Sequence, residues 1–305
     1  MIKTLAAKLP RIALALAILL PVWLLAVMFA AKLDLIPKLL AFGTLTIQTG
    51  LYASGVIALV AVIGLVFSLL VKPRKGWAAC LIALLVPAFF MLGLNQLRET
   101  AGGVPFIYDI TTNPADAPAF TAAMMEAREA EDANPLIQFQ TPLGEQEKWQ
   151  DNEDLADTTA AELIASGYPD LDLTTLRIEE PVDKVVEVIE AAMEMRGFDN
   201  ITSDPATGIV EATDEVFWYG FRDDVVARVR ADGEGSAVDF RSTSRVGTSD
   251  LGVNAKRIAD LRQATLDRLT SRGPIDPKAV VEEAAEAEAE ETDSDETASE
   301  EAAAE

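Results

Sequence analysis

Three long apolar runs lie within the first 97 residues of this 305-residue chain, and nothing comparable follows them. Each run holds 20 or 21 residues without an acidic or basic side chain; they are Ile12–Ala31, Leu51–Val71 and Trp77–Leu97. A helix needs about 20 such residues to cross the hydrocarbon core of a bilayer, where the backbone must satisfy its own hydrogen bonds. The pattern predicts a three-helix membrane anchor followed by a water-soluble domain.

The first run is predicted to stay in the protein as a membrane span. A cleaved signal peptide also begins with basic residues, but its apolar stretch usually holds only about 7–15 residues. This run is longer, and Val27–Ala30 offers no clear small-x-small cleavage site. None of the runs carries a charged side chain mid-span, so neither a transporter nor a channel is predicted.

Basic residues near the ends of the runs indicate the orientation, because short loops rich in Lys and Arg stay in the cytoplasm. The N-terminal stub and the second loop hold six of them: Lys3, Lys8, Arg11, Lys72, Arg74 and Lys75. The first loop and the exit from the third run hold three: Lys32, Lys38 and Arg98. We therefore expect a multi-pass membrane protein with a cytoplasmic N-terminus and residues 98–305 outside; in a bacterium this is the inner membrane with a periplasmic soluble domain.

Charge is distributed as unevenly as apolarity. Residues 1–98 carry nine basic side chains and one acidic one, whereas residues 99–305 carry 16 basic and 48 acidic side chains. The resulting net charge of −32 argues against nucleic acid as a partner and against electrostatic docking on anionic lipid. The partners we expect are the lipid bilayer, through residues 12–97, and an envelope protein or an anionic ligand.

Composition divides the chain into four parts. Residues 1–98 form the three-helix anchor. Residues 99–176 form a lead segment rich in Pro, Asp and Glu, with extended stretches, turns and a helix over 115–131. Residues 177–273 form an α+β core. Residues 274–305 form an acidic tail that we expect to be disordered, because its Ala, Glu, Asp, Ser and Thr bury too little apolar area to offset the entropy of ordering.

The core begins with a helix and continues with two pairs of strands. Apolar residues recur at helical spacing from Val182 to Met193, Pro181 can start this helix, and Gly197 supplies a left-handed C-cap. The predicted strands are Phe198–Ser203, Gly208–Tyr219, Asp224–Ala231 and Ser236–Val246. A last helix begins near Leu251 and stops at Gly273-Pro274.

The hairpin loop Asp232–Gly235 sets the register of the last two strands if Ala231 pairs with Ser236. The pairs are then Val229–Val238 and Ala227–Phe240 on one face, and Arg228–Asp239 and Val226–Arg241 on the other. This alternation favours a sheet with one buried and one open face. The predicted fold class is a membrane-anchored α+β protein: three transmembrane helices followed by an antiparallel sheet covered by helices.

Several stretches also carry a family resemblance; they are Asp109–Thr112, Tyr168–Leu171, Ile209–Thr213, Phe217–Asp224 and Arg241–Ile258. Together they resemble the bacterial domain of unknown function 1499. The resemblance covers roughly residues 105–272, is most specific in its C-terminal half, and departs from the family in the acidic middle. It implies a bacterial envelope protein, in some members with an N-terminal membrane anchor. It supplies no catalytic or binding residue.

Two function hypotheses follow. The first is a membrane-tethered envelope binding or scaffolding protein without catalysis, cofactor or metal. The chain has no histidine, and its single cysteine, Cys80, lies in the third run, so the commonest general base and thiol chemistry are missing from the soluble part. The alternative is a periplasmic hydrolase or transferase that uses Asp residues with Arg241 and Arg245. A pocket joining these two arginines to buried carboxylates would favour the alternative.

The candidate anion or ligand site is a basic cluster around the last hairpin and helix. Its residues are Arg241, Arg245, Ser249, Asp250, Lys256 and Arg257. Guanidinium groups and a helix N-terminus can hold a phosphate or carboxylate. The interpretation that we favour is a structural network, in which the arginines pair with Asp223, Asp224, Asp239 and Glu211. In the same interpretation Thr248, Ser249 or Asp250 caps the helix.

Four aromatic residues also bear on a site: Phe217, Trp218, Tyr219 and Phe221. They fit either a ligand groove or core packing at the end of a strand, and we favour packing.

Overall fold

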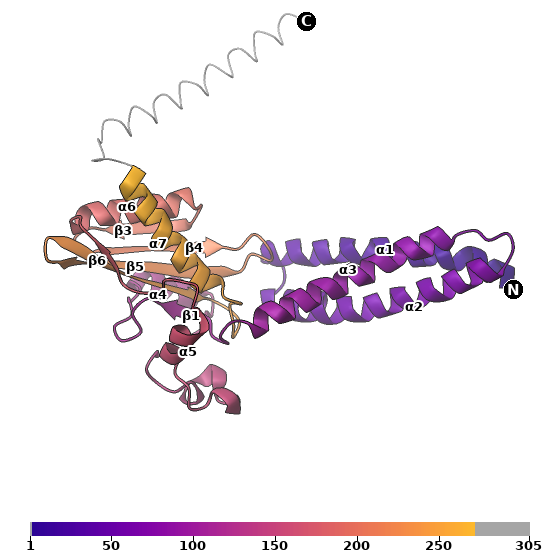
Figure 1. Ribbon diagram of the computed structural model, residues 1–305, viewed down its shortest axis with the longest axis horizontal. Coiled ribbons are helices and arrows are strands. Elements are labelled where there is room, and N and C mark those ends of the chain that lie inside the picture. The colour runs from indigo at the N-terminus through magenta and orange to yellow at the C-terminus, as the bar shows by residue number, and fades with distance from the viewer. Residues whose placement is uncertain (1, 272–305) are drawn as a thin grey trace, which may run out of the picture. The chain divides into compact units, whose positions relative to one another are not determined.

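A computed structural model describes residues 2–271 of the chain (Figure 1). Two compact units are distinguished, Met1–Arg262 and Gln263–Glu305. The predicted acidic tail, residues 274–305, and the predicted helix stop at Gly273 lie outside the described residues. The site discussed below lies entirely within the first unit.

Three long helices open the chain and pack side by side. They are α1 (Ile2–Lys32), α2 (Thr49–Leu70) and α3 (Trp77–Gly102), and a π-helical stretch, η1 (Leu40–Gln48), leads into α2. By length and composition, the stretches Ala7–Lys32, Leu40–Leu70 and Trp77–Gly102 can each cross a membrane. The second begins earlier than the predicted run because the residues before Leu51, although they include Thr and Gly, form continuous helix without a charged side chain.

Small side chains line the contacts inside the bundle of α1, α2 and α3. Ala13, Ala61 and Ala83 are buried where the helices meet, whereas Leu59 and Phe89 are more than half exposed on the outside. A bundle in water buries its large apolar residues. Close contact through small residues with large apolar residues facing outward is how helices pack in lipid.

Six strands form one antiparallel sheet with the order β1-β6-β5-β4-β3, and β2 pairs with β6 as well. The strands are β1 (Asp109–Thr111), β2 (Leu176–Ile178), β3 (Asp199–Asp204), β4 (Ile209–Glu215), β5 (Arg222–Asp232) and β6 (Gly235–Ser244). The predicted α+β class and the predicted register of β5 with β6 are confirmed. The lead segment contributes β1, and β2 runs across the predicted boundary at residue 176, so the sheet takes strands from both parts.

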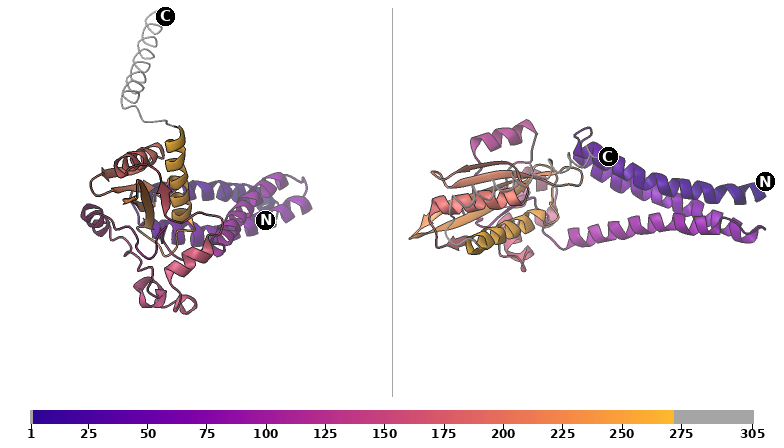
Figure 2. Two further views of the ribbon diagram at one scale, coloured as in Figure 1. Left: turned by 60° about the vertical axis from the view of Figure 1, so that its left-hand side comes forward. Right: turned by 90° about the horizontal axis from the view of Figure 1, so that it is seen from above.

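One face of the sheet is covered by α6 (Val182–Met195) and the first half of α7 (Val253–Ser271), and we call it the helix-covered face (Figure 2). Its side chains are mostly apolar: Val225, Ala227, Val229, Val238 and Phe240. The predicted C-cap of α6 is confirmed. Gly197 has φ 73°, and the Phe198 amide donates to the Met193 carbonyl at 3.1 Å.

The opposite face carries Asp224, Val226, Asp239, Arg241 and Arg245, and the prediction that it is open is wrong. The lead segment lies across it. Phe120 and Met124 pack on Val226, and the four charged residues are buried. We call this the segment-covered face; Figure 2 shows α4 (Ala122–Ala130) on the side of the sheet opposite α6. The helix α4 is shorter than predicted because it starts only after Thr121, whose side chain accepts a hydrogen bond from the Met124 amide.

The rest of the lead segment, for which the sequence pattern gives no clear prediction, folds into short helical pieces. They are three 3-10 turns, Leu143–Glu145, Glu147–Trp149 and Glu153–Leu155, and helix α5 (Ala160–Gly167). Trp149 holds this region in place. Its ring stacks on Tyr108 with 5.2 Å between centroids, and its indole nitrogen donates to the Phe106 carbonyl at 2.9 Å.

Candidate functional site

One end of the sheet contacts the loop between α1 and α2, residues 33–39. Lys32 at the end of α1 forms an ion pair with Glu215 at 3.0 Å, and Arg222 reaches Asp34 at 2.8 Å. If all three helices span a membrane, two spans, α2 and α3, separate this loop from the domain. The loop and the domain then lie on the same side of the membrane. The contacts agree with that arrangement.

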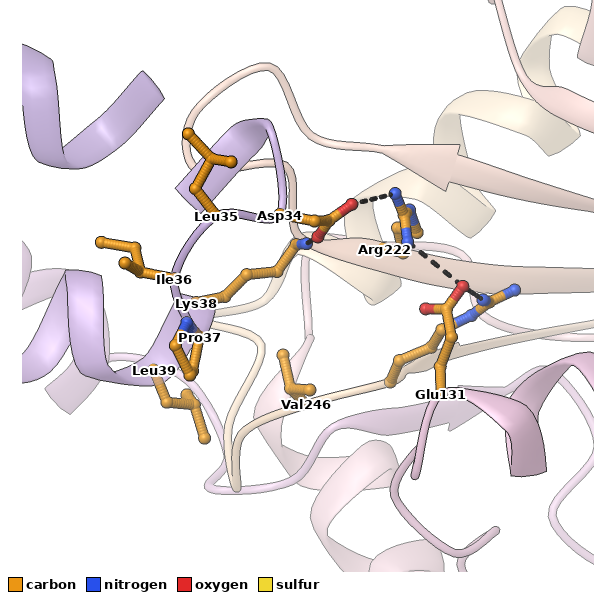
Figure 3. Close-up of a pocket in the computed structure, with 10 residues that line it drawn as sticks. Asp34, Leu35, Ile36, Pro37, Lys38, Leu39, Glu131, Arg222 and Val246 are labelled. Atoms are coloured by element: carbon orange, nitrogen blue, oxygen red, sulfur yellow. Dashed lines mark hydrogen bonds and ion pairs between the residues drawn. The ribbon is translucent and has the colours of Figure 1, made fainter. Parts of the chain in front are cut away.

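A cavity of about 500 Å³ lies between this loop and the sheet (Figure 3). Its apolar lining is Leu35, Ile36, Pro37, Leu39 and Val246. Its charged lining is Asp34, Lys38, Glu131, Arg222 and Arg245. The loop supplies most of the apolar wall, and α4, β5 and the end of β6 supply most of the charged wall.

Glu131, just after α4, bridges two arginines of the charged wall. Its Oε1 atom accepts from Nη1 of Arg245 at 2.7 Å and from Nη1 of Arg222 at 3.1 Å, as the dashed lines in Figure 3 show for this network. The Glu131 side chain is 41% exposed, whereas that of Arg245 is only 7% exposed. The carboxylate is therefore the accessible partner of a buried guanidinium.

Arg245 is also fixed by hydrogen bonds to the buried carboxylate of Asp224. Its Nη2 and Nε atoms lie 2.7 and 3.1 Å from Oδ1 of Asp224, and Nη2 also donates to the Thr213 hydroxyl. Burial opposes the charge of Arg245, but the hydrogen bond and charge of Asp224 outweigh burial and raise its pKa. Arg128 contacts the other oxygen of Asp224 at 2.5 Å. The guanidinium of Arg245 is thus charged and fixed.

Arg222 is surrounded by carboxylates: besides Glu131 and Asp34, it donates through Nε to Glu215 at 3.1 Å. Burial again opposes its charge, and these partners raise its pKa. The pKa of Asp34 is lowered, chiefly by a hydrogen bond from Lys38 and then by Arg222. Within the charged wall, Arg222 and Asp34 therefore stabilise each other's charged forms.

A family model described as "Protein of unknown function (DUF1499)" matches residues 109–265, just over half of the chain. The chain belongs to this family. A search of curated proteins finds no match. The DUF1499 region contains the whole sheet and the charged residues Glu131, Arg222 and Arg245. Residues 34–39 lie outside it, so the DUF1499 domain and the loop between α1 and α2 build the cavity jointly.

The six predicted ligand residues do not share one surface of the DUF1499 domain. Arg241 and Arg245 lie on the segment-covered face, and Arg257 lies on the helix-covered face, where it reaches Asp223 and Asp214, each at 2.7 Å. Lys256 is exposed and pairs with Asp260. Among the six, Arg245 lines the cavity. Anion binding by any of the six stays a prediction.

The pairing of these arginines largely follows the structural-network interpretation. Arg241 forms two hydrogen bonds with Asp109, at 2.6 and 3.0 Å, while Arg245 and Arg257 pair with Asp224 and Asp223 as predicted. Two predicted carboxylates have other partners. Asp239 pairs with Arg228 and Arg230, and Glu211 accepts from the Thr121 amide at 3.0 Å.

The predicted cap of the last helix is confirmed. Asp250 accepts from the amides of Gly252 and Asn254 at 3.0 and 2.7 Å, and Ser249 accepts from the Leu251 amide. Burial raises the pKa of Asp250 to about 6, although the two amide bonds oppose that shift. This carboxyl group is used by the fold and does not line the cavity.

The arrangement expected for a hydrolase or transferase is not observed in the cavity. Arg241 is not among its lining residues, and the carboxylates there, Asp34 and Glu131, are exposed. Within residues 2–271, no group of three or more His, Cys, Asp or Glu side chains is arranged to hold a metal ion.

The four aromatic residues separate into two pairs. Tyr219 and Phe221 pack against Phe42 of η1, with centroid distances of 5.4 and 6.1 Å. Phe217 and Trp218 are each 58% exposed, so the prediction of core packing is wrong for these two. They lie at a turn, beyond Glu215, the last paired residue of β4, so neither strand pairing nor a neighbouring strand covers them.

Sequence reasoning missed four residues of the charged wall: Asp34, Lys38, Glu131 and Arg222. Arg222 and Asp34 are 188 residues apart, and no local pattern joins them. The sequence did contain one signal for Asp34. It is the single acidic residue among the first 98, and a lone carboxylate in a short loop suggests a basic partner elsewhere in the chain.

Proposed function

We propose that this protein is a membrane-tethered binding module of the bacterial envelope that holds the anionic head group of an amphipathic molecule. The observation that carries the proposal is Glu131, an exposed carboxylate that bridges Arg222 and Arg245 inside a cavity with an apolar opposite wall. Glu131 occupies the position that a phosphate or carboxylate of a ligand would take. Binding exchanges one anion for another on the same guanidinium groups.

The two walls of the cavity fit the two ends of such a ligand. The head group meets Arg222 and Arg245, and the acyl chain lies along Leu35 and Leu39 towards the helices. Nonspecific attraction of anions is weak because the soluble part is strongly acidic. The choice of ligand therefore depends on contacts inside the cavity. There, fixed guanidinium groups bind a planar or tetrahedral anion through two hydrogen bonds at once.

The proposed orientation places the cavity at the outer surface of the inner membrane. The support for this orientation is the charge bias of the sequence: six basic residues flank the spans on the N-terminal side, against three on the domain side, Lys32, Lys38 and Arg98. Alkaline phosphatase fused after Leu97 should be active, and green fluorescent protein at the same point should be dark. The reverse pattern contradicts a periplasmic domain.

The binding proposal is tested on the full-length protein in uncharged detergent micelles. Short-chain phosphatidic acid, short-chain phosphatidylcholine and inorganic phosphate are titrated by calorimetry. Glu131→Gln removes the competing charge and should tighten binding of phosphatidic acid about 5-fold, since an exposed ion pair is worth about 1 kcal/mol. Arg222→Ala should weaken it by about 10-fold or more, because a hydrogen bond to a charged group is worth about 1.5–3 kcal/mol.

Glu129→Gln is the matched control, since it makes the same chemical change on the exposed surface of α4, two residues away. It should bind phosphatidic acid like the parent. If Glu131→Gln and Glu129→Gln give the same affinity, Glu131 does not occupy a ligand position. Inorganic phosphate that binds as tightly as the lipid would make the ligand a soluble anion.

A further inference from the structure

The turn between β4 and β5, residues 216–221, is built to rest on the helix bundle. The Val216 amide donates to the Phe221 carbonyl at 2.8 Å and closes the turn. Tyr219 and Gly220 both have left-handed backbone, with φ 63° and 66°. A left-handed conformation costs a tyrosine about 1 kcal/mol, so contacts of the turn must offset that strain.

Those contacts are made with residues of the apolar helices. Tyr219 packs against Val27, Ala31 and Ala41, and its hydroxyl lies 2.8 Å from that of Thr46. A Cβ atom at Gly220 would lie 3.1 Å from Cα of Lys32, which shows how closely the backbone of the turn approaches the end of α1.

Some of these contacts lie below the end of α1, within its apolar stretch. Val27 precedes Lys32 by five residues, which is about 7–8 Å at 1.5 Å per residue. Val27, Ala41 and Thr46 all belong to stretches long and apolar enough to span a membrane. Lys32, whose ammonium group lies 5.3 Å from the centre of the Phe217 ring, is the charged residue that marks the end of the first stretch.

Phe217 and Trp218 lie beside this contact and stay largely exposed. Their rings meet edge to face at 5.1 Å, and both side chains are 58% exposed. Two large exposed aromatic side chains, beside a lysine and next to apolar helices, have the composition of the interfacial belts of membrane proteins. The strongly acidic domain gains no electrostatic attraction to anionic lipid, so aromatic insertion is the interaction open to it.

We infer that the β4–β5 turn is a second membrane-contact element, whose Phe217 and Trp218 side chains insert into the interfacial layer of the bilayer. The three helices tether the domain, and the turn fixes its tilt on the lipid surface. This places the mouth of the cavity, which Arg222 lines one residue after the turn, at the level of the head groups.

The test uses single labelled cysteines in the full-length protein, reconstituted into phosphatidylcholine vesicles. The single native cysteine is first replaced as Cys80→Ala. Trp218→Cys carries an environment-sensitive fluorophore, and Glu234→Cys in the β5–β6 turn carries the same label as the control. The two turns are about 33 Å apart along β5 at 3.3 Å per residue, so a label at 234 stays in water.

The label at 218 should emit at shorter wavelength than the label at 234, and nitroxide lipids should quench it. A nitroxide near the ester group should quench more strongly than one at the end of the acyl chain, because insertion is interfacial. Labels at 218 and 234 with the same emission and no quenching would overturn the inference.

A second measurement needs no label. The tryptophan emission of the parent minus that of Trp218→Phe isolates Trp218, because Trp23 and Trp77 in the helices and the buried Trp149 are common to both proteins. Brominated phosphatidylcholine should quench this difference emission. A difference emission that iodide in the water quenches fully and brominated lipid does not quench would contradict insertion.

Discussion

Both faces of the sheet are covered, but the side chains that cover them differ in chemistry. On the helix-covered face, Val229, Val238 and Phe240 meet the apolar side of α6. On the segment-covered face, Arg241 and Arg245 meet the carboxylates of Asp109 and Asp224. Alternation along a strand tells which residues share a face. It does not tell which face is exposed to solvent, because a charged face can be buried once every charge has a partner.

The faces also contribute to the protein in different ways. Apolar burial stabilises the fold by about 25 cal/mol for each Å² removed from water. Buried ion pairs add little net stability, but they cost a great deal when one partner is lost. The main contribution of the ion pairs on the segment-covered face is therefore geometric. They fix α4 and the guanidinium of Arg245 relative to the cavity.

Met193→Asp on the helix-covered side should have the largest effect. Met193 is fully buried on α6, and an unpaired carboxylate there costs about 4–5 kcal/mol or more, enough to prevent stable folding. Met195→Asp is the same substitution at a residue that is 63% exposed, and it should cost below about 1 kcal/mol. Circular dichroism on heating in detergent measures both. Equal melting of the two variants would show that the assigned face of α6 is wrong.

Arg241→Met on the segment-covered face should cost about 3–5 kcal/mol, because it leaves the buried Asp109 without its guanidinium partner. Arg230→Met makes the same change on the same face at a half-exposed side chain and should cost below about 1 kcal/mol. Urea denaturation followed by circular dichroism gives both values. The double variant Arg241→Met/Asp109→Asn should recover much of the loss; a double variant no more stable than the single one would contradict the pairing.

The pH dependence of stability should distinguish a carboxyl group beside α7 from one on the segment-covered face. Burial raises the pKa of Asp250 to about 6, so its contribution is fully present below pH 3.8 and is lost as the pH rises through about 6. At 1.36 kcal/mol per pKa unit this loss is about 3 kcal/mol. Asp250→Asn should remove the loss between about pH 4 and pH 7.

Asp239 should behave in the opposite way. Burial opposes its ionisation, but hydrogen bonds from Thr175 and Arg228 outweigh burial and lower its pKa. Its contribution is present above its unfolded pKa and is lost on acidification, and Asp239→Asn should flatten only that acid limb. Denaturation curves for both variants, measured from acid pH to about pH 7, check the prediction. The same pH slope in Asp250→Asn as in the parent would contradict it.

Gly220→Ala should have the smallest effect of these changes and tests the contact between the sheet and α1. Gly220 and Gly233 both have positive φ, so alanine at either position costs about 1 kcal/mol. Alanine at 220 also meets the backbone of Lys32, whereas nothing lies within 4 Å at 233. Thermal unfolding in vesicles should show a larger loss for Gly220→Ala. Equal losses would mean that the turn does not touch the helix.

Much of the fold could be predicted from the sequence because its signals are local. The helix of α6, its cap at Gly197 and the register of β5 with β6 follow from periodicity and turn residues within a few positions. The short strands β1 and β2 carry too few residues to show a period. The covering of the charged face by Phe120 and Met124 was missed because it depends on where a Pro-rich segment returns in space.

The candidate site could be predicted only in part. Arg245 was identified from a local basic cluster, but its neighbours in that cluster, Arg241 and Arg257, point into different contacts of the sheet. The other cavity residues come from separate elements, and Glu131 meets Arg222 and Arg245 from about 90 and 110 positions away in the chain. No residue pattern in one stretch of sequence encodes such a meeting.

The most direct test of the proposed binding site is photocrosslinking with a phosphatidic acid analogue that carries a diazirine beside its head group. Full-length protein in phosphatidylcholine vesicles is irradiated, and labelled peptides are identified by mass spectrometry. We predict labels in residues 33–39 and at Val246, with higher yield in Glu131→Gln and lower yield in Arg222→Ala. Labels confined to the outward faces of α1, α2 and α3, with the same yield in all three proteins, would contradict a head-group site in this cavity.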